Sequence, residues 1–404
     1  MLKRDLHSVL IRLAARMPIL TIMGPRQSGK TTLVRAAFAD KPYVSLELPE
    51  ERAFATNDPR GFLARFPDGA ILDEVQRAPD LLSYIQVDVD EEDRPGRWIL
   101  TGSQNLLLMQ GVSQSLAGRT SLHTLLPFSL TELRSWPAPD VARLDAPGAG
   151  AGEPVPEQDP WRTLWTGLYP RIHDKGLDPR AWLADYSRTY VERDLRDVLN
   201  VMDIDGFHRF VRLAAARTGQ ELNLSSLGAD AGIAQSTASQ WLSALRTSYL
   251  ITLLAPYHKN FNKRLRKRPK LHFLDTGLAC YLLDIRTPQM LRDHPLRGPV
   301  FESFVVSELT KAFANAGEEA PLYHWRDATG HQIDVIVDLG DRQIPVEVKS
   351  GMTVATDAFD GLAWWTSIPS NPAATGVLVH GGPASHSRGG FRVRPWWIWD
   401  RRNP

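Results

Sequence analysis

The sequence has almost no cysteine, no long apolar stretch and little net charge, and each shortage excludes a class of protein. Cys280 is the only cysteine among 404 residues, so no disulfide can form within the chain, which fits the reducing cytoplasm. No stretch approaches the roughly 20 apolar residues that a membrane-spanning helix needs, and the N-terminus lacks the charged-then-apolar order of a signal peptide. A formal net charge of +1 means that contact with nucleic acid would depend on a local basic patch.

The remaining composition is that of an ordinary folded protein, with 43% hydrophobic and 23% charged residues. The length is sufficient for two or three domains. In residues 1–136, short apolar runs alternate with helical stretches, the first run being Ile19 to Met23. This alternation predicts an α/β fold in which a parallel sheet is covered by helices on both faces.

A phosphate-binding motif directly follows this first apolar run. Residues 24–32 match the pattern G-x-x-x-x-G-K-T in every fixed position. The glycines let backbone N–H groups surround phosphates, and the following helix directs its positive end at them. We expect Lys30 to reach the β- and γ-phosphates of ATP, and Thr31 to bind Mg²⁺ through its hydroxyl. The candidate nucleotide-binding residues are Gly24, Pro25, Arg26, Gln27, Ser28, Gly29, Lys30, Thr31 and Thr32.

Two carboxylates end an apolar strand about forty residues later. We expect Asp73 to hold Mg²⁺ through water and Glu74 to polarise the attacking water, which favours a hydrolase over a kinase. The next predicted strand leads into Ser103 and Gln104, which either sense the γ-phosphate or simply form a turn. Arg119 is either a finger that contacts a neighbouring subunit's nucleotide or a solvated surface arginine.

These segments resemble prokaryotic AAA-type P-loop ATPases that carry a C-terminal domain of uncharacterised function. The resemblance extends over nearly the whole chain, through residues 24–32, 72–76, 100–103, 115–119, 168–170, 190–194, 275–278 and 346–350. It implies a fused ATPase, winged-helix and PD-(D/E)XK nuclease-like architecture. Because AAA-type sites lie between subunits, it also implies a homo-oligomeric ring, which we expect to be a hexamer.

The domain organisation predicted from these patterns has five parts. An ATPase domain at 1–136 is followed by a linker or surface loop at 137–160, which contains six prolines and three glycines. The remaining parts are a helical segment at 161–220, a winged-helix-like domain at 221–285 and a nuclease-like domain at 286–404.

The winged-helix-like region contains a second helix with small polar residues at its start, which suits either a DNA major groove or an ordinary helix cap. A basic segment comes after it, where a winged helix would have its β-hairpin wing. Its density of cations favours phosphate contacts, and the alternatives are a solvated loop or a patch that binds an acidic protein surface. The candidate nucleic-acid-binding residues are Lys259, Lys263, Arg264, Arg266, Lys267, Arg268 and Lys270.

The C-terminal region contains the order Asp334, about a dozen residues, then Glu347-x-Lys349, which resembles the PD-(D/E)XK nuclease core. In that core two carboxylates bind Mg²⁺, and the lysine assists in charge stabilisation. Glu302, on a predicted helix, is the best candidate for a further acidic ligand. The alternative is a hairpin on which Glu347 and Lys349 pair across a sheet surface.

We therefore expect an ATP-hydrolysing protein whose C-terminal half binds, and in the stronger form of the hypothesis cuts, DNA or RNA. The alternative is a signalling or toxin-like ATPase switch whose C-terminal domains bind a protein partner without nuclease activity.

Overall fold

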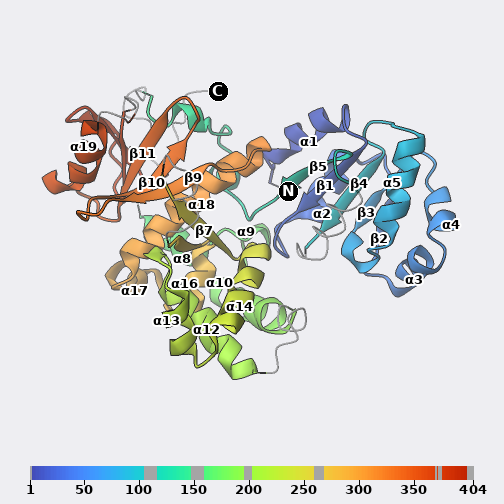
Figure 1. Ribbon diagram of the computed structural model, residues 1–404, viewed down its shortest axis with the longest axis horizontal. Helices are drawn as coiled ribbons and strands as arrows, with labels where there is room; N and C mark the ends of the chain where they lie inside the picture. Colours follow the sequence, from blue (N-terminus) through green and yellow to red (C-terminus); the bar gives the residue numbers. More distant parts are fainter. Residues whose placement is uncertain are drawn as a thin grey trace. The chain divides into compact units, whose positions relative to one another are not determined.

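The computed structural model describes residues 2–103, 116–146, 159–194, 203–258, 268–368, 371 and 375–397. The chain forms two compact units (Figure 1). The first unit comprises residues up to Phe128, with the short pieces 247–249 and 313–318, and the second comprises the remainder. Among the described residues, no helix is both long and apolar enough to cross a membrane.

The first unit contains a five-stranded sheet. Its strands are β1 (Ile19–Met23), β2 (Tyr43–Ser45), β3 (Ile71–Asp73), β4 (Trp98–Gly102) and β5 (Thr120–Thr124). They are all parallel and lie in the order β2-β3-β4-β1-β5. The helices are α1 (Leu6–Ala14), α2 (Lys30–Ala37), α3 (Pro49–Asn57), α4 (Pro59–Ala64) and α5 (Leu81–Glu91), with a 3₁₀ turn η1 (Val75–Arg77) before α5.

Alternation of side chains along β1 separates two apolar cores. Leu20 and Ile22 lie in a core with α1 and α2, whereas Ile19 and Met23 lie in a core with α3, α4 and α5. The sheet is therefore covered on both faces, which confirms the predicted fold class. Since all strands run the same way, the P-loop after β1 and the carboxylates at the end of β3 lie together at the carboxyl ends of the strands.

The second unit begins with α7 (Leu130–Leu133) and a 3₁₀ turn η2 (Val141–Arg143). Its helices continue with α8 (Pro160–Thr166), α9 (Pro170–Lys175), α10 (Pro179–Tyr186), a π-helical segment η3 (Ser187–Asp194), α12 (Ile204–Ala216), α13 (Leu224–Ala231), α14 (Gln235–Thr247), α16 (Thr276–Leu282), α17 (Pro288–Asp293) and α18 (Arg297–Ala316). The last two are η4 (Thr356–Phe359) and α19 (Asp360–Ser367). The final residues of α14 and of α18 belong to the first unit.

In the part of the second unit that the structure describes, nine strands form one sheet in the order β13-β14-β12-β11-β10-β9-β7-β8-β6. The strands are β6 (Gln220–Glu221), β7 (Ile251–Pro256), β8 (Lys270–Phe273), β9 (Leu322–Arg326), β10 (Gln332–Asp338), β11 (Gln343–Lys349), β12 (Val377–His380), β13 (His386–Arg388) and β14 (Phe391–Pro395). Strand β7 pairs antiparallel with β8 and parallel with β9. It therefore joins the small antiparallel group that follows α12 to the C-terminal strands.

The described start of the predicted linker or surface loop is partly exposed, and its last residues pack against the rest of the chain. Residues 137–146 include buried Val141 and Leu144. The carboxylate of Asp145 accepts a hydrogen bond from Arg342 at 2.8 Å, and the backbone oxygen of Ala146 accepts one from Arg394 at 2.6 Å. Its proline content predicted a linker or surface loop. The sequence did not indicate these contacts, because the two arginines lie 197 and 248 residues further along the chain.

The buried carboxylate of Asp275 connects two of the segments on which the family resemblance rests. Its hydrogen bonds give both segments a structural role. Asp275 Oδ1 accepts the backbone N–H of Leu278 at 2.9 Å and so caps α16. Its Oδ2 accepts the backbone N–H of Leu168 at 2.7 Å. The segments 168–170 and 275–278 are thus joined by one side chain, on a residue that is 4% exposed.

We predict that Asp275→Ala lowers the free energy of unfolding by about 2–4 kcal/mol, because two buried N–H groups lose their acceptor. Urea denaturation followed by circular dichroism would measure this. Asp178→Ala is the matched control, since exposed Asp178 caps α10 through a single bond to the Ala181 N–H. That control should cost about 1 kcal/mol; equal losses in the two variants would contradict the buried role of Asp275.

Candidate nucleotide site and C-terminal carboxylate cluster

The loop after β1 requires glycine at two positions. Gly24 has φ +151°, and a Cβ there would lie 2.1 Å from the backbone oxygen of Leu125. Gly29 has φ +92°, a left-handed conformation that other residues rarely adopt. The backbone of residues 24–29 therefore takes a course that larger side chains would prevent, as expected for a phosphate-binding loop.

Lys30, the first residue of α2, is folded back into this loop. Its ammonium donates to the backbone oxygens of Gly24 at 2.9 Å and Pro25 at 2.8 Å, and the residue is 5% exposed. Burial lowers the pKa of Lys30 to about 8, against the opposing effect of Glu74 and Asp73. Among the described residues, the Lys30 ammonium thus has backbone carbonyl oxygens, and no carboxylate, as its hydrogen-bond partners.

Asp73, at the end of β3, collects hydroxyl donors from three other elements. Its Oδ2 accepts from Thr31 at 2.9 Å and from Tyr43 at 2.7 Å. Its Oδ1 accepts from Thr101 on β4. The predicted pair of Thr31 and Asp73 is therefore formed, and its hydroxyl and carboxylate oxygens are the kind of ligand that Mg²⁺ prefers. These residues fit a magnesium ion.

Glu74 lies beside Asp73 in a strained backbone conformation. Its φ of +58° and ψ of +45° are left-handed, which is uncommon for a residue other than glycine. Its Oε2 accepts hydrogen bonds from Ser103 at 2.8 Å and from Gln76. The structure thus brings together the predicted residues Glu74 and Ser103, whereas Gln104 lies outside the described residues.

The predicted arginine finger is bonded elsewhere. The Arg119 guanidinium donates to Asp90 Oδ2 at 2.8 Å and to the backbone oxygen of Ala117 at 3.2 Å, and its side chain is 33% exposed. Both partners belong to its own chain. A role for Arg119 at a neighbouring subunit's nucleotide therefore stays a prediction.

A second cluster of charges forms in the C-terminal part of the chain. Glu302 on α18, Asp334 on β10 and Glu347 on β11 are the carboxylates that the sequence suggested, and Lys349 donates to Glu347 Oε1 at 2.6 Å. Burial, followed by the neighbouring Asp334 carboxylate, raises the pKa of Glu302 to about 8 and that of Glu347 to about 7. Lys349, the fourth residue that the sequence assigned to this cluster, lies beside Glu347 as expected.

A fifth residue was assigned by the sequence to a different role. Lys270, the first residue of β8, donates to Glu302 Oε1 at 2.9 Å and to Asp334 Oδ1 at 3.3 Å. It is 7% exposed, so its inclusion among the phosphate-contacting cations was wrong. The reason is that Lys270 begins β8, a strand whose four residues are all buried, whereas exposed Arg268 precedes the strand.

The C-terminal carboxylates do not fit a metal ion as they stand. Among the described residues, no three histidine, cysteine or carboxylate side chains are arranged to share one. The ammonium of Lys270 lies between two of the three expected ligands. Of the other predicted nucleic-acid-binding residues, Lys259, Lys263, Arg264, Arg266 and Lys267 lie outside the described residues.

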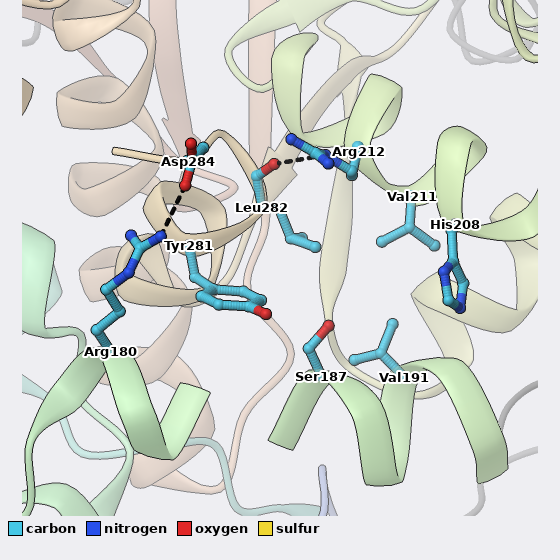
Figure 2. A pocket seen from close by; sticks show the side chains of 9 residues that line it. All are labelled: Arg180, Ser187, Val191, His208, Val211, Arg212, Tyr281, Leu282 and Asp284. Carbon is cyan, nitrogen blue, oxygen red and sulfur yellow. Dashed lines mark hydrogen bonds and ion pairs between the residues drawn. The ribbon is translucent and has the colours of Figure 1, made fainter. Parts of the chain in front are cut away.

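A polar hollow of about 330 Å³ lies among α10, η3, α12 and α16 (Figure 2). Its two arginines are already bonded: Arg180 to Asp284 at 2.7 Å, and Arg212 to the backbone oxygen of Leu282 at 3.2 Å. Both partners lie at the end of α16. These arginines therefore hold α16 to its neighbouring helices.

Comparison with known proteins places the chain among relatives of undetermined function. It is 32% identical over 356 residues to two curated proteins, "Uncharacterized protein Rv2008c" of Mycobacterium tuberculosis and "Uncharacterized protein Mb2031c" of Mycobacterium bovis. The match covers 87% of this chain and 74% of each relative. This chain belongs to their family.

Three family models describe the parts of this family member. An AAA domain matches residues 16–134, a domain of unknown function (DUF8612) matches 157–289, and another domain of unknown function (DUF4143) matches 297–399. The AAA domain contains all of the nucleotide-site residues described above. The C-terminal carboxylate cluster lies in DUF4143, except for Lys270, which lies in DUF8612.

The similarity of this chain to solved structures is weaker than its similarity to these two relatives. The Walker-type ATPase PABY2304 of Pyrococcus abyssi is 14% identical, with 69% of this chain and 94% of that chain covered, at a TM-score of 0.41. The RuvB Holliday junction branch migration motor of Thermotoga maritima is 18% identical, with 66% and 95% covered, at 0.29. AMPPCP-bound DnaA from Aquifex aeolicus is 15% identical, with 60% and 85% covered, at 0.30. Scores of this size do not bear on the function of the family.

Sequence reasoning missed three residues of this family member's nucleotide site. Tyr43 and Thr101 hydrogen-bond Asp73, but Tyr43 belongs to no motif, and Thr101 was given no role although it lies in the matched segment 100–103. Arg4 donates to the backbone oxygens of Ser28 at 2.7 Å and Leu126 at 2.7 Å, and so supports the P-loop from outside. The end of the apolar run that forms β4 was the sequence signal nearest to Thr101. The residues predicted to act at that strand end were Ser103 and Gln104 instead.

We predict that Tyr43→Phe weakens Mg²⁺–ATP binding several-fold, because Asp73 loses one of its three hydroxyl donors, a loss of about 1 kcal/mol. Titration with a fluorescent ATP analogue in the presence of Mg²⁺ would measure the change. Tyr84→Phe is the control, since Tyr84 is 37% exposed on α5 and its loss should leave binding unchanged. Wild-type affinity in Tyr43→Phe would remove Tyr43 from the site.

Proposed function

We propose that this protein binds ATP with Mg²⁺ and hydrolyses it, and that its C-terminal half binds nucleic acid. The observation that carries the first part is the contact between Thr31 and Asp73, with Glu74 directly beside it. This contact brings the P-loop and the strand-end carboxylates to one point at the edge of the sheet. The AAA-domain match over residues 16–134 supports the same conclusion.

Each residue of the nucleotide site has a role in the proposed reaction. Backbone N–H groups of the P-loop and the Lys30 ammonium bind the phosphates, and Thr31 and Asp73 hold the magnesium ion. When bound, that ion neutralises charge on the phosphate oxygens. Glu74 orients a water molecule for attack on the γ-phosphorus, the bond to the bridging oxygen breaks, and ADP and phosphate are formed. Ser103 holds the Glu74 carboxylate and so connects the end of β4 to that step.

Nucleic-acid binding is supported by the order of elements between α12 and β8. The order α12-β6-α13-α14-β7-β8 matches the one expected for the proposed winged helix, in which α14 would enter a groove and the β7–β8 connection would be the wing. Ser236, Ser239 and Gln240 of α14 are exposed, whereas Ala238 and Trp241 are buried. The connection carries Arg268, which is exposed, and the further cations named above.

The proposal also includes assembly of several copies of this chain into a ring. If the nucleotide lies between subunits, Arg119 is the candidate that would reach it, and its partial exposure leaves it accessible to a second copy. Its bond to Asp90 would then be exchanged for one to phosphate.

We predict that Lys30→Ala abolishes ATP binding and that Glu74→Gln keeps binding but lowers turnover by about 10²-fold or more. The first variant loses a phosphate contact, and the second loses only the group that orients water. Phosphate release and nucleotide retention on a desalting column would separate the two effects. Glu91→Gln, a change in the last residue of α5, is the control and should retain wild-type turnover. Wild-type turnover in Lys30→Ala would reject the site.

We further predict that DNA or RNA raises the ATPase rate and that replacing Lys263, Arg264, Arg266 and Lys267 by alanine removes this effect. The same change should reduce the slope of log affinity against log salt by about 0.7–0.9 for each phosphate that is no longer neutralised. Removal of exposed Arg12, Arg16, Arg60 and Arg292 is the charge-matched control. An ATPase rate indifferent to all single- and double-stranded nucleic acids would favour the protein-binding switch.

A further inference from the structure

Lys270 contacts the C-terminal carboxylates from outside the domain that supplies them. Glu302, Asp334, Glu347 and Lys349 all come from α18, β10 and β11, whereas Lys270 comes from β8, at the far side of β7 and β9 in the same sheet. Its Nζ lies 2.9 Å from Glu302 Oε1 and 3.3 Å from Asp334 Oδ1. The side chains of all three are at most 13% exposed.

Two of the four remaining carboxylate oxygens of the cluster also accept hydrogen bonds from donors of this chain. Asp334 Oδ2 accepts the backbone N–H of Val348 at 3.0 Å, and Glu347 Oε1 accepts from Lys349 at 2.6 Å. Both oxygens of Asp334 are therefore bonded. By contrast, Glu347 Oε2 is buried and has no hydrogen-bond partner within the part of the chain that the structure describes. A divalent ion held by both Glu302 and Asp334 would have to displace the ammonium that lies between them.

The balance of charge supports the same conclusion. Three carboxyl groups face the buried Lys270 ammonium and the Lys349 ammonium, whose side chain is 40% exposed, so two positive charges already oppose the carboxylates without a metal. Burial by itself lowers the pKa of Lys270, but Glu302 and Asp334 more than offset this, and the pKa is raised above its ordinary value. The ammonium therefore stays protonated where it lies.

We propose that Lys270 is the built-in cation of this cluster: it takes the position between Glu302 and Asp334 that a divalent metal would need. The C-terminal domain consequently keeps the carboxylate arrangement of a nuclease-like core but does not hold the metal or cut nucleic acid. This inference is independent of the proposed nucleic-acid binding, because it concerns only what occupies the carboxylates.

Titration of the full chain with Mn²⁺, without nucleotide and followed by electron paramagnetic resonance, tests the proposal. Every protein carries Asp73→Asn, so that the nucleotide site does not contribute. Lys270→Met should acquire one Mn²⁺ site, with affinity raised about tenfold or more over the parent. Adding Asp334→Asn to Lys270→Met should remove that site again. Lys349→Met is the matched control, since it deletes the same charge from the same cluster but leaves the Lys270 ammonium between Glu302 and Asp334.

Thermal unfolding provides a second readout. Mn²⁺ should raise the melting temperature of Lys270→Met and leave that of the parent and of Lys349→Met unchanged. If Lys270→Met does not fold, Lys270→Gln is the substitute, because its neutral amide retains a donor of similar reach.

Two results would overturn the proposal. One is a Mn²⁺ site in the parent chain, with Lys270 intact, that Asp334→Asn removes; Mg²⁺-dependent cleavage of nucleic acid that Asp334→Asn abolishes has the same meaning. The other is a folded Lys270→Met or Lys270→Gln protein that acquires no Mn²⁺ site. Neither outcome depends on whether nucleic acid binds to α14 or stimulates the ATPase.

Discussion

The carboxylate of Asp73 is the group on which the nucleotide site depends. Its two oxygens accept hydroxyl groups from α2, β2 and β4, through Thr31, Tyr43 and Thr101. Since Asp73 itself ends β3, one side chain fixes the positions of four elements at the carboxyl edge of the sheet. The strand order makes this arrangement possible, because β4 lies directly between β3 and the P-loop strand β1.

The sequence was sufficient for the parts of this site that are local in the chain. The P-loop glycines, Lys30 and Thr31 lie within residues 24–32, and the fixed spacing reflects the close approach of backbone to phosphate. The strand before Asp73 and Glu74 could be recognised by its apolar run. The contacts of Tyr43 and Thr101 with Asp73 could not be recognised, because they depend on the order of strands in the sheet.

The same limit explains where the C-terminal prediction failed. Asp334, Glu347 and Lys349 lie on two consecutive strands, so their proximity followed from the alternation of side chains along a hairpin. Lys270 lies 32 residues before Glu302 and follows a run of basic residues, so its sequence neighbours suggested phosphate binding. Its actual partners depend on β7 pairing with both β8 and β9. No local pattern contains that information, and the contacts made by the start of the predicted linker have the same explanation.

Asp73 ends strand β3 of the first sheet, and Asp334 lies within strand β10 of the second sheet. The two carboxylates are chemically identical, and the groups that donate hydrogen bonds to them decide what each can bind. Asp73 is bonded by neutral hydroxyls, which orient the carboxylate and leave its charge uncompensated; the nearby Lys30 ammonium donates to backbone oxygens instead. A cation entering there gains from that charge and displaces no other cation. Asp334 is bonded by an ammonium and a backbone N–H, so its charge is already matched. The attraction that a carboxylate offers to a metal is therefore set by the charge of the groups around it, and two aspartates that look equivalent in sequence differ in how far their charge is already compensated.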